Sequence, residues 1–249
     1  LSPPFSPPRP LSPTAPLAPL DPMRTYTDFG VDFFLGGYIQ ANPDPVLATE
    51  FTNAPYNNTF KWWWGNFYGG TPSAYTGPDA AFSDYGFLYT EASTYTSTPT
   101  CNLNGDCIGD DGAHDFVLKY ECPNNENIKT ISFWYHMYSD DVSSDGVPFF
   151  PCIGDIMVAT SYGNNESIWN ASGNQGDQWN QASVQVDAPQ VFIIGHLPSL
   201  DACNEMSSYS PGTTIRWTSD MAIDYLQVLC YSSDPPPPQA PPPSSPPSS

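Results

Sequence analysis

The sequence predicts an all-β protein, a two-sheet antiparallel sandwich with a polyproline II tail at each end. Prolines gather at the two ends, since nine of the 30 lie in residues 1–22 and nine more in residues 235–249. Between them, short runs of β-branched and aromatic residues alternate with Gly, Asn, Asp and Pro. Helical periodicity is nearly absent there, which favours strands over helices. The chain therefore divides into a tail at 1–24, one domain at 25–232 and a tail at 233–249.

The N-terminal tail has a proline at every third position from Pro4 to Pro22. A polyproline II helix has three residues per turn, so these prolines line one edge of a rod. A second edge is mostly apolar and contains Phe5, Leu11, Leu17 and Leu20. Such an edge favours docking into an aromatic-lined groove of a neighbouring copy. The alternative is a low-complexity linker whose period is accidental.

Seven strands are predicted in the domain, at residues 86–91, 115–120, 130–138, 155–161, 181–186, 190–195 and 222–231. Several alternate apolar and polar residues, as at Val184 and Val186, which buries one face of the strand. This number of short strands with turn residues between them is typical of a sandwich. The aromatic content of 14% suits either its core or a binding face.

The C-terminal tail alternates proline blocks with serine pairs and has no apolar edge, which is typical of a solvated, semi-rigid rod. The Ser-Pro-Pro runs resemble the hydroxyproline-rich glycoproteins of plant and green-algal cell walls. In that family the prolines are hydroxylated and carry O-linked sugars. The resemblance implies such modification at Pro3, Pro4, Pro7, Pro8, Pro235, Pro236, Pro237, Pro238, Pro241, Pro242, Pro243, Pro246 and Pro247.

The charge excludes several classes of partner. The chain has 26 acidic and six basic residues, a formal charge of −20. A nucleic-acid binder needs a cationic face, and an anionic membrane surface repels an acidic chain. No apolar run is long enough to span a bilayer. The partners that we expect are further copies of the chain and glycans.

The cysteines and sequons predict a secreted glycoprotein. The six cysteines include no Cys-x-x-Cys pair, which favours disulfides over a metal site. Sequons for N-glycosylation occur at Asn57, Asn165 and Asn170. The chain begins at Leu1 without a leader pattern, so we expect a removed signal peptide or a fragment. The expected location is the extracellular matrix, a cell wall or a surface fibre.

Several segments together resemble a known family. In order, they are Phe-Trp-Tyr-His-Met-Tyr at 133–138, Gly-Asp-Ile-Met-Val at 154–158, Ile-Trp at 168–169, Gly-Asn-Gln-Gly-Asp-Gln-Trp at 173–179 and Met-Ala-Ile-Asp-Tyr-Leu at 221–226. Over about residues 60–230 the chain resembles a MAM domain, the extracellular module named after meprin, A5 antigen and receptor phosphatase mu. This resemblance implies a jelly-roll sandwich that serves adhesion and oligomerisation, not catalysis.

The resemblance also suggests disulfides. The family usually has a cysteine just before the strand that starts at residue 133, and the nearest here is Cys122, which we expect to pair with Cys230. Two segments that depart from the family pattern, 139–152 and 198–212, carry one cysteine each, which suggests Cys152–Cys203. Cys101 and Cys107 would close a small local loop. Six cysteines allow fifteen pairings, so all three remain predictions.

We expect no obligatory cofactor, and calcium is the metal that the acidic loops suit best. The resemblance implies a cation role for Asp79 and Asp224, although the family's second Asp after residue 224 is Tyr225 here. A second candidate set comprises Asn102, Asn104, Asp106, Asp110 and Asp111. The alternative is that all of these acids belong to solvated loops.

The densest aromatic cluster comprises Trp62, Trp63, Trp64, Phe60, Phe67 and Tyr68. Alternation in a strand would bury Trp63 and expose Trp62 and Trp64, or the reverse. An exposed pair would stack on sugar rings or receive the N-terminal rod of another subunit, and ordinary core packing is the alternative.

Motifs of catalysis are absent, including Gly-x-Ser-x-Gly, His-Glu-x-x-His and a phosphate loop. We therefore expect His136 to be a core histidine and the protein not to be an enzyme. The sequence predicts a structural subunit of an extracellular fibre or wall, assembled through the N-terminal tail with Trp62 and Trp64. The alternative is a carbohydrate-binding or adhesion module that recognises wall or matrix glycans.

Overall fold

The structure is a computed structural model. It describes residues 24–27, 51–53, 59–66, 71, 76–82, 86–92, 112–122, 126–140, 150–164, 166–206, 214–215 and 219–231. Several predicted features lie outside these residues: both proline-rich tails with Phe5, Leu11, Leu17 and Leu20, the sequons at Asn57 and Asn165, Cys101 with Cys107, and the second acidic loop. They stay predictions.

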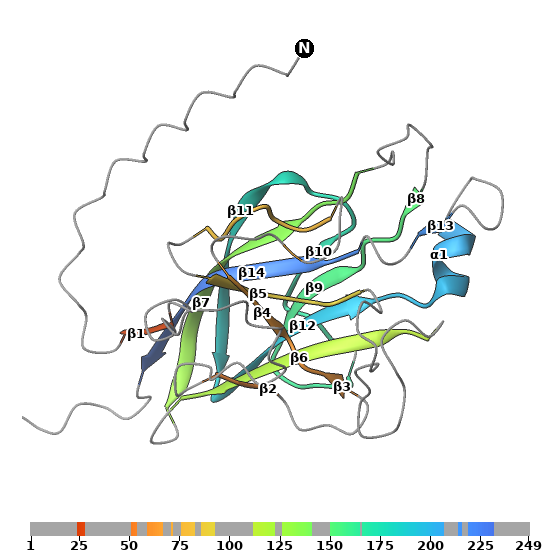
Figure 1. The fold of residues 1–249 in the computed structure, drawn as a ribbon. Coiled ribbons are helices and arrows are strands. Elements are labelled where there is room, and N and C mark those ends of the chain that lie inside the picture. The colour runs from red at the N-terminus through yellow and green to blue at the C-terminus, as the bar shows by residue number, and fades with distance from the viewer. Residues whose placement is uncertain are drawn as a thin grey trace, which may run out of the picture.

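Two six-stranded sheets face each other in the described part of the chain (Figure 1). Sheet A has the order β11 (Gly176–Ala188), β7 (Asn127–Met137), β14 (Met221–Tyr231), β5 (Gly86–Tyr89) and β4 (Trp63–Asn66), with β1 (Arg24–Thr27) also paired to β14. Sheet B has the order β10 (Trp169–Ser172), β9 (Asp155–Ala159), β12 (Gln190–Leu197), β6 (His114–Glu121) and β2 (Phe51–Asn53), with β3 (Thr59–Phe60) also paired to β6. A separate pair joins β8 (Phe150–Pro151) to β13 (Thr214–Ile215).

The chain passes repeatedly between the sheets, since β6, β9, β10 and β12 belong to sheet B while β7, β11 and β14 belong to sheet A. This interleaving confirms the predicted two-sheet sandwich of jelly-roll type. The pairs are antiparallel except β3 with β6 and β13 with β8, which are parallel. Strand β1 lies antiparallel beside β14, with Arg24 opposite Leu229, so the chain enters the domain next to where β14 ends (Figure 1).

All seven predicted strands are present, and the longest differs most from its prediction. Strand β11 starts at Gly176, before the predicted start at residue 181, because its first part is polar and lacks alternation. Helix α1 (Leu200–Met206) was not predicted, since seven residues are too few for a visible helical period. Its local signals are the Ser199 hydroxyl, which accepts a hydrogen bond from the Ala202 amide, and Asp201 in the first turn.

The core lies between the facing sides of the two sheets. Alternate residues of the paired strands point inward, as with Phe133 and Val184 of sheet A and Leu118 and Ile193 of sheet B. A smaller apolar cluster lies on the other side of sheet B and consists of Val117, Ala159, Phe192 and Ile194, with Met157 and Tyr162 packed against it. No helix within the described ranges is long and apolar enough to cross a membrane.

Two disulfides tie the elements together. Cys122, just after β6, is bonded to Cys230 in β14 and so connects sheet B to sheet A. Cys152, before β9, is bonded to Cys203 in α1. Both pairs agree with those expected from the sequence. Disulfides of this kind are typical of extracellular proteins.

Candidate functional site

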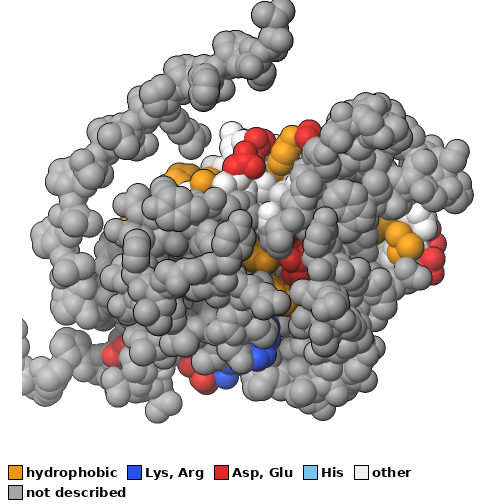
Figure 2. Space-filling view, in the orientation of Figure 1, with side chains coloured by type: hydrophobic (Ala, Val, Ile, Leu, Met, Phe, Trp, Pro, Cys, Tyr) orange, Lys and Arg blue, Asp and Glu red, His pale blue; other side chains and the backbone are white. Residues whose placement is uncertain are grey.

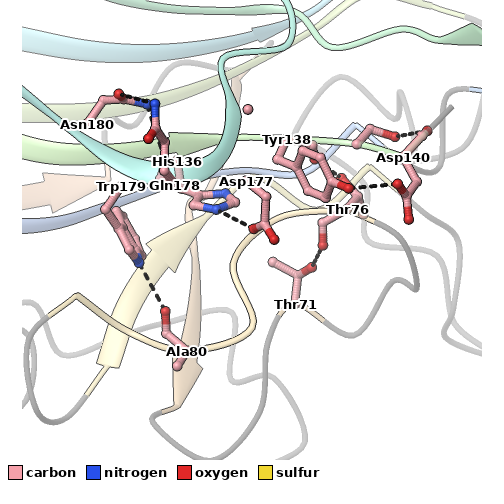
Figure 3. A network of polar contacts seen from close by, with 12 residues as sticks. Thr71, Thr76, Ala80, His136, Tyr138, Asp140, Asp177, Gln178, Trp179 and Asn180 are labelled. Carbon is pink, nitrogen blue, oxygen red and sulfur yellow. Dashed lines mark hydrogen bonds and ion pairs between the residues drawn. The ribbon is translucent and has the colours of Figure 1, made fainter. Parts of the chain in front are cut away.

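A segment at residues 76–82 crosses the outer side of sheet A and is anchored there at two points (Figure 3). At the first, the Thr76 hydroxyl and the Gly77 amide both donate hydrogen bonds to the Tyr138 carbonyl, at 3.1 and 3.0 Å. At the second, the indole Nε1 of Trp179 donates to the Ala80 carbonyl at 3.1 Å. The segment is therefore fixed between β7 and β11, and its last residue, Phe82, is held in place.

Four aromatic rings form what we call the aromatic shelf: Phe82, Trp134, Trp179 and Tyr225. Phe82 stacks on Trp134 with ring centroids 3.9 Å apart and an interplanar angle of 15°. Trp179 and Tyr225 meet the Phe82 ring edge-on at 6.3 and 6.4 Å. Phe82 is nevertheless 41% exposed, which is unusual for a large apolar side chain held this firmly. The shelf thus offers solvent an immobilised aromatic surface.

Neutral polar side chains extend from the shelf along β11, β7 and β14. We call them the hydroxyl–amide face, and they are Thr130, Ser132, Gln181, Ser183, Gln185 and Gln227. Directly paired residues of antiparallel strands point to the same side. Gln181 is paired with Trp134, and Ser132 is paired with both Ser183 and Gln227. The face and the shelf therefore lie on one side of sheet A, the side away from the core.

The hydrogen-bonding capacity of this face is largely directed outward. Gln181, Ser183 and Gln185 on the edge strand β11 are exposed. The Ser132 hydroxyl donates to the Gln227 side-chain oxygen at a long 3.4 Å. Hydroxyl and amide groups supply donors and acceptors without charge. Among the side chains coloured in the view of Figure 2, those of Lys and Arg occupy one small area, while acidic side chains appear at several separate places.

A buried histidine lies behind the shelf. His136 is 2% exposed, its Nε2 is 3.2 Å from Oδ1 of Asp177, and its ring meets Trp179 edge-on at 5.4 Å. Burial lowers the pKa of the His136 imidazole, and the carboxylates of Asp177 and Asp79 partly oppose this shift. The ring is thus packed beneath the shelf on the outer side of sheet A. It is buried as expected from the sequence, but by Trp179 and the 76–82 segment and not between the two sheets.

The expectation for Trp62 is wrong. Trp62 has no exposed surface, and its indole Nε1 donates to the Phe116 carbonyl of sheet B at 2.9 Å. Trp63 is also buried, at 5% exposure. Trp62 and Trp63 are neighbours and point to opposite sides of the chain. Both sides are covered here, so alternation exposes neither ring. The side chain of Trp64 lies outside what the structure describes.

The two residues suggested as cation ligands lie in different surroundings. Asp79 is exposed on the 76–82 segment, whereas Asp224 is fully buried and accepts a hydrogen bond from the Tyr225 amide at 2.6 Å. Tyr225 has a φ of 51°, so this contact fixes a left-handed turn within β14. Within the described ranges, no group of three or more His, Cys, Asp or Glu side chains is placed to hold a metal ion.

The sequence pattern does not predict the aromatic shelf as a whole. Trp134 lies in the Phe-Trp-Tyr-His-Met-Tyr segment, and its alternation with the buried Phe133 is the one signal that places it on the outer side. Phe82 has no periodic neighbours, and its position depends on hydrogen bonds to residues far along the chain. The densest run of tryptophans was therefore the more visible signal, although it belongs to the interior.

The comparison with known proteins finds distant sequence similarity over part of the chain. The chain matches no protein-family model. A segment of 81 residues, 32% of the chain, is 28% identical to MAM domain-containing glycosylphosphatidylinositol anchor protein 1 of Gallus gallus. The match spans only 7% of the length of that protein. The similarity to a MAM-domain protein is therefore partial, extending over a third of this chain.

Solved structures overlap with the fold to a limited extent. The K2 cleaved adhesin domain of Lys-gingipain has a TM-score of 0.42 and 10% identity, over 83% of this chain and 99% of that one. TmCBM61, solved with β-1,4-galactotriose, has a TM-score of 0.28 and 14% identity, over 61% of this chain and 74% of that one. These values describe the course of the backbone, and they assign no ligand to this chain.

Proposed function

We propose that this domain is a non-enzymatic extracellular module for adhesion that binds neutral glycans on the outer side of sheet A. The observation that carries the proposal is the stacked but exposed Phe82 next to the hydroxyl–amide face. A sugar ring presents C–H groups on its faces and hydroxyls around its rim. An aromatic ring accepts the former, and neutral side chains such as Gln181 and Ser183 bond with the latter.

Preorganisation supports the same proposal. Binding costs free energy when side chains must be ordered, and this cost falls when they are already fixed. Phe82 is held by its stack on Trp134 and by the anchors at Thr76 and Ala80. An extended glycan could also follow the 13-residue strand β11, along which Gln181, Ser183 and Gln185 point the same way. The site thus suits an oligosaccharide more than a single sugar.

The experiment is a glycan array with the secreted protein, followed by titration calorimetry with the best ligand. Phe82→Ala should weaken binding by about 1–2 kcal/mol, or roughly five- to thirtyfold, because one stacking surface is lost. Gln181→Ala should weaken it less. Ile168→Ala is the matched control, since Ile168 is a similarly exposed apolar residue, at 44%, on the opposite sheet. Equal affinity of the wild type and Phe82→Ala would exclude this face.

The fibre hypothesis is a separate proposal about the whole chain. It depends on the patterned tail at residues 1–22, outside the described residues, and on a groove in a neighbouring copy. The burial of Trp62 removes one of the residues that were expected to line such a groove. Glycan binding has the more direct support, because its residues are described and exposed.

A further inference from the structure

A second exposed apolar residue lies on the opposite sheet. Ile168, at 44% exposure, immediately precedes the edge strand β10, and its amide donates to the Val158 carbonyl at 2.8 Å. Next to it in sequence, Trp169 points into the sandwich, where its ring meets Phe133 edge-on at 5.4 Å. Residues on either side of an inward residue point outward in an extended chain. Ile168 and Asn170 therefore both lie on the outer side of sheet B.

The pairing of the strands extends this outer surface from the edge strand β10 towards the middle of sheet B. Asn170 is paired with Met157, Met157 with Ile194, and Ile194 with Val117. All four side chains thus share the outer side of sheet B, in one row across β10, β9, β12 and β6. Three of them belong to or contact the smaller apolar cluster. In this row Val117 and Ile194 are buried, Met157 is half-buried, and Asn170 at the edge of the sheet is exposed.

That asparagine begins the sequon Asn170-Ala171-Ser172. Asn170 and Ser172 are both exposed, and Ala171 between them is buried at 8%. The Asn170 side chain forms no hydrogen bond among the described contacts, so its amide is directed to solvent. An acceptor with this geometry is accessible, and a glycan attached to it projects over the outer side of the sheet.

We propose that Asn170 carries an N-linked glycan that covers Ile168 and Met157 and closes the free edge of sheet B. In the attachment reaction, Nδ2 of Asn170 forms a bond to the anomeric carbon of a lipid-linked oligosaccharide. The bond from that carbon to the lipid diphosphate breaks, and one amide proton is released to solvent. The first sugar then lies beside Ile168, which is two residues before Asn170 and on the same side of the strand.

Two physical problems are resolved by such a glycan. An exposed apolar patch promotes association, and covering it removes that surface from water. An edge strand presents unpaired backbone groups that another chain could pair with, and β10 has no charged residue to prevent this. A hydrophilic, bulky group on Asn170 acts against both. This inference concerns the chain's own modification and is independent of glycan recognition at the aromatic shelf.

The test uses the full chain secreted from eukaryotic cells. Enzymatic deglycosylation in ¹⁸O-water followed by peptide mass spectrometry reports whether Asn170 is occupied. Ser172→Ala removes the glycan while leaving Asn170 in place, and Ser172→Thr, which keeps the sequon, is the matched control. We expect Ser172→Ala, but not Ser172→Thr, to self-associate and to bind an apolar dye several-fold more strongly. Adding Ile168→Ser to Ser172→Ala should reverse both effects.

An unoccupied Asn170 in the secreted protein would overturn the proposal. So would an occupied Asn170 whose loss changes neither dye binding nor association. Should Ser172→Ala not be secreted, the comparison is made on folded protein before and after enzymatic glycan removal. Asn57→Gln and Asn165→Gln then leave Asn170 as the remaining acceptor among the three sequons.

Discussion

Trp62 illustrates how one residue can be assigned to the wrong surface. It belongs to a run of three tryptophans, which suggests a binding patch, yet its ring fills the space between the sheets. Its contact surface includes Gly195 of β12, where an added Cβ would lie 3.0 Å from the Trp62 ring. The indole also bonds across the sandwich to the Phe116 carbonyl. Its role is to pack and to connect the two sheets.

Trp62→Ala should therefore destabilise the fold by about 3–5 kcal/mol, as expected for loss of a large buried aromatic side chain. Urea unfolding followed by circular dichroism measures this loss. Trp62→Phe should cost less, since it retains much of the volume but removes the Nε1 donor. Glycan affinity per folded molecule should stay unchanged. A variant as stable as the wild type but unable to bind glycans would restore the surface role.

His136 makes stability depend on pH. Its folded-state pKa lies below the ordinary value, so the unfolded chain takes up a proton more readily. Its contribution is complete above about pH 6.5 and is lost as the pH falls below that value towards the folded-state pKa. The melting temperature should fall between about pH 7 and 5, and less steeply in His136→Gln.

Asp177→Asn should lower the pKa of His136 further, since Asp177 raises it. Nuclear magnetic resonance of the imidazole measures this directly. An upward shift in Asp177→Asn would contradict the assignment of the contact.

At the scale of elements, the long strands follow from local sequence, whereas short strands such as β4 and β10 and the loops do not. The alternation of Val184 and Val186, and the apolar runs at 130–138 and 222–231, were sufficient to locate long strands. The segment at 76–82 has no such pattern. Its place is decided by contacts such as Thr76 with Tyr138, 62 residues apart in sequence. Since Phe82 depends on that segment, the candidate site could not be predicted from local sequence.

The disulfide between Cys122 and Cys230 should contribute more to stability than the other. It spans a separation of 108 residues, against 51 for Cys152–Cys203. The double variant Cys122→Ala/Cys230→Ala should lose about 2–5 kcal/mol. From loop entropy alone, this loss of stability should exceed the loss in Cys152→Ala/Cys203→Ala by about 0.7 kcal/mol. Urea midpoints of the two variants test the order, and the reverse order would show that strain or local packing dominates.

At the scale of the whole molecule, the acidic character sets the choice of partner. With six basic residues against 26 acidic ones, the chain lacks the cations that polyanionic ligands require. The hydroxyl–amide face follows this rule, since it is built from uncharged groups. Neutral sugars can approach it without electrostatic cost, whereas sulfated or uronic glycans are repelled by the surrounding charge.

Assembly through the N-terminal tail is tested by deleting residues 1–22. If the apolar edge with Leu11 and Leu17 docks on a neighbour, the deletion should abolish filaments or higher oligomers. The domain should remain folded, with an unchanged melting temperature, because its core is formed by residues of both sheets. Light scattering and electron microscopy measure the assembly, and circular dichroism measures the melting temperature. Intact assemblies of the shortened chain would exclude the docking hypothesis.

The pairing of β1 with β14 has a mechanical consequence. Arg24 lies opposite Leu229, so a pulling force applied through the two tails acts at the same end of this strand pair. The hydrogen bonds between the strands are then loaded one after another, and β1 peels away at low force. Rupture cannot continue freely along β14, because Cys230 is covalently attached to Cys122 in the other sheet. Under tension β1 should therefore be released first, while the disulfide holds the end of β14 to the other sheet.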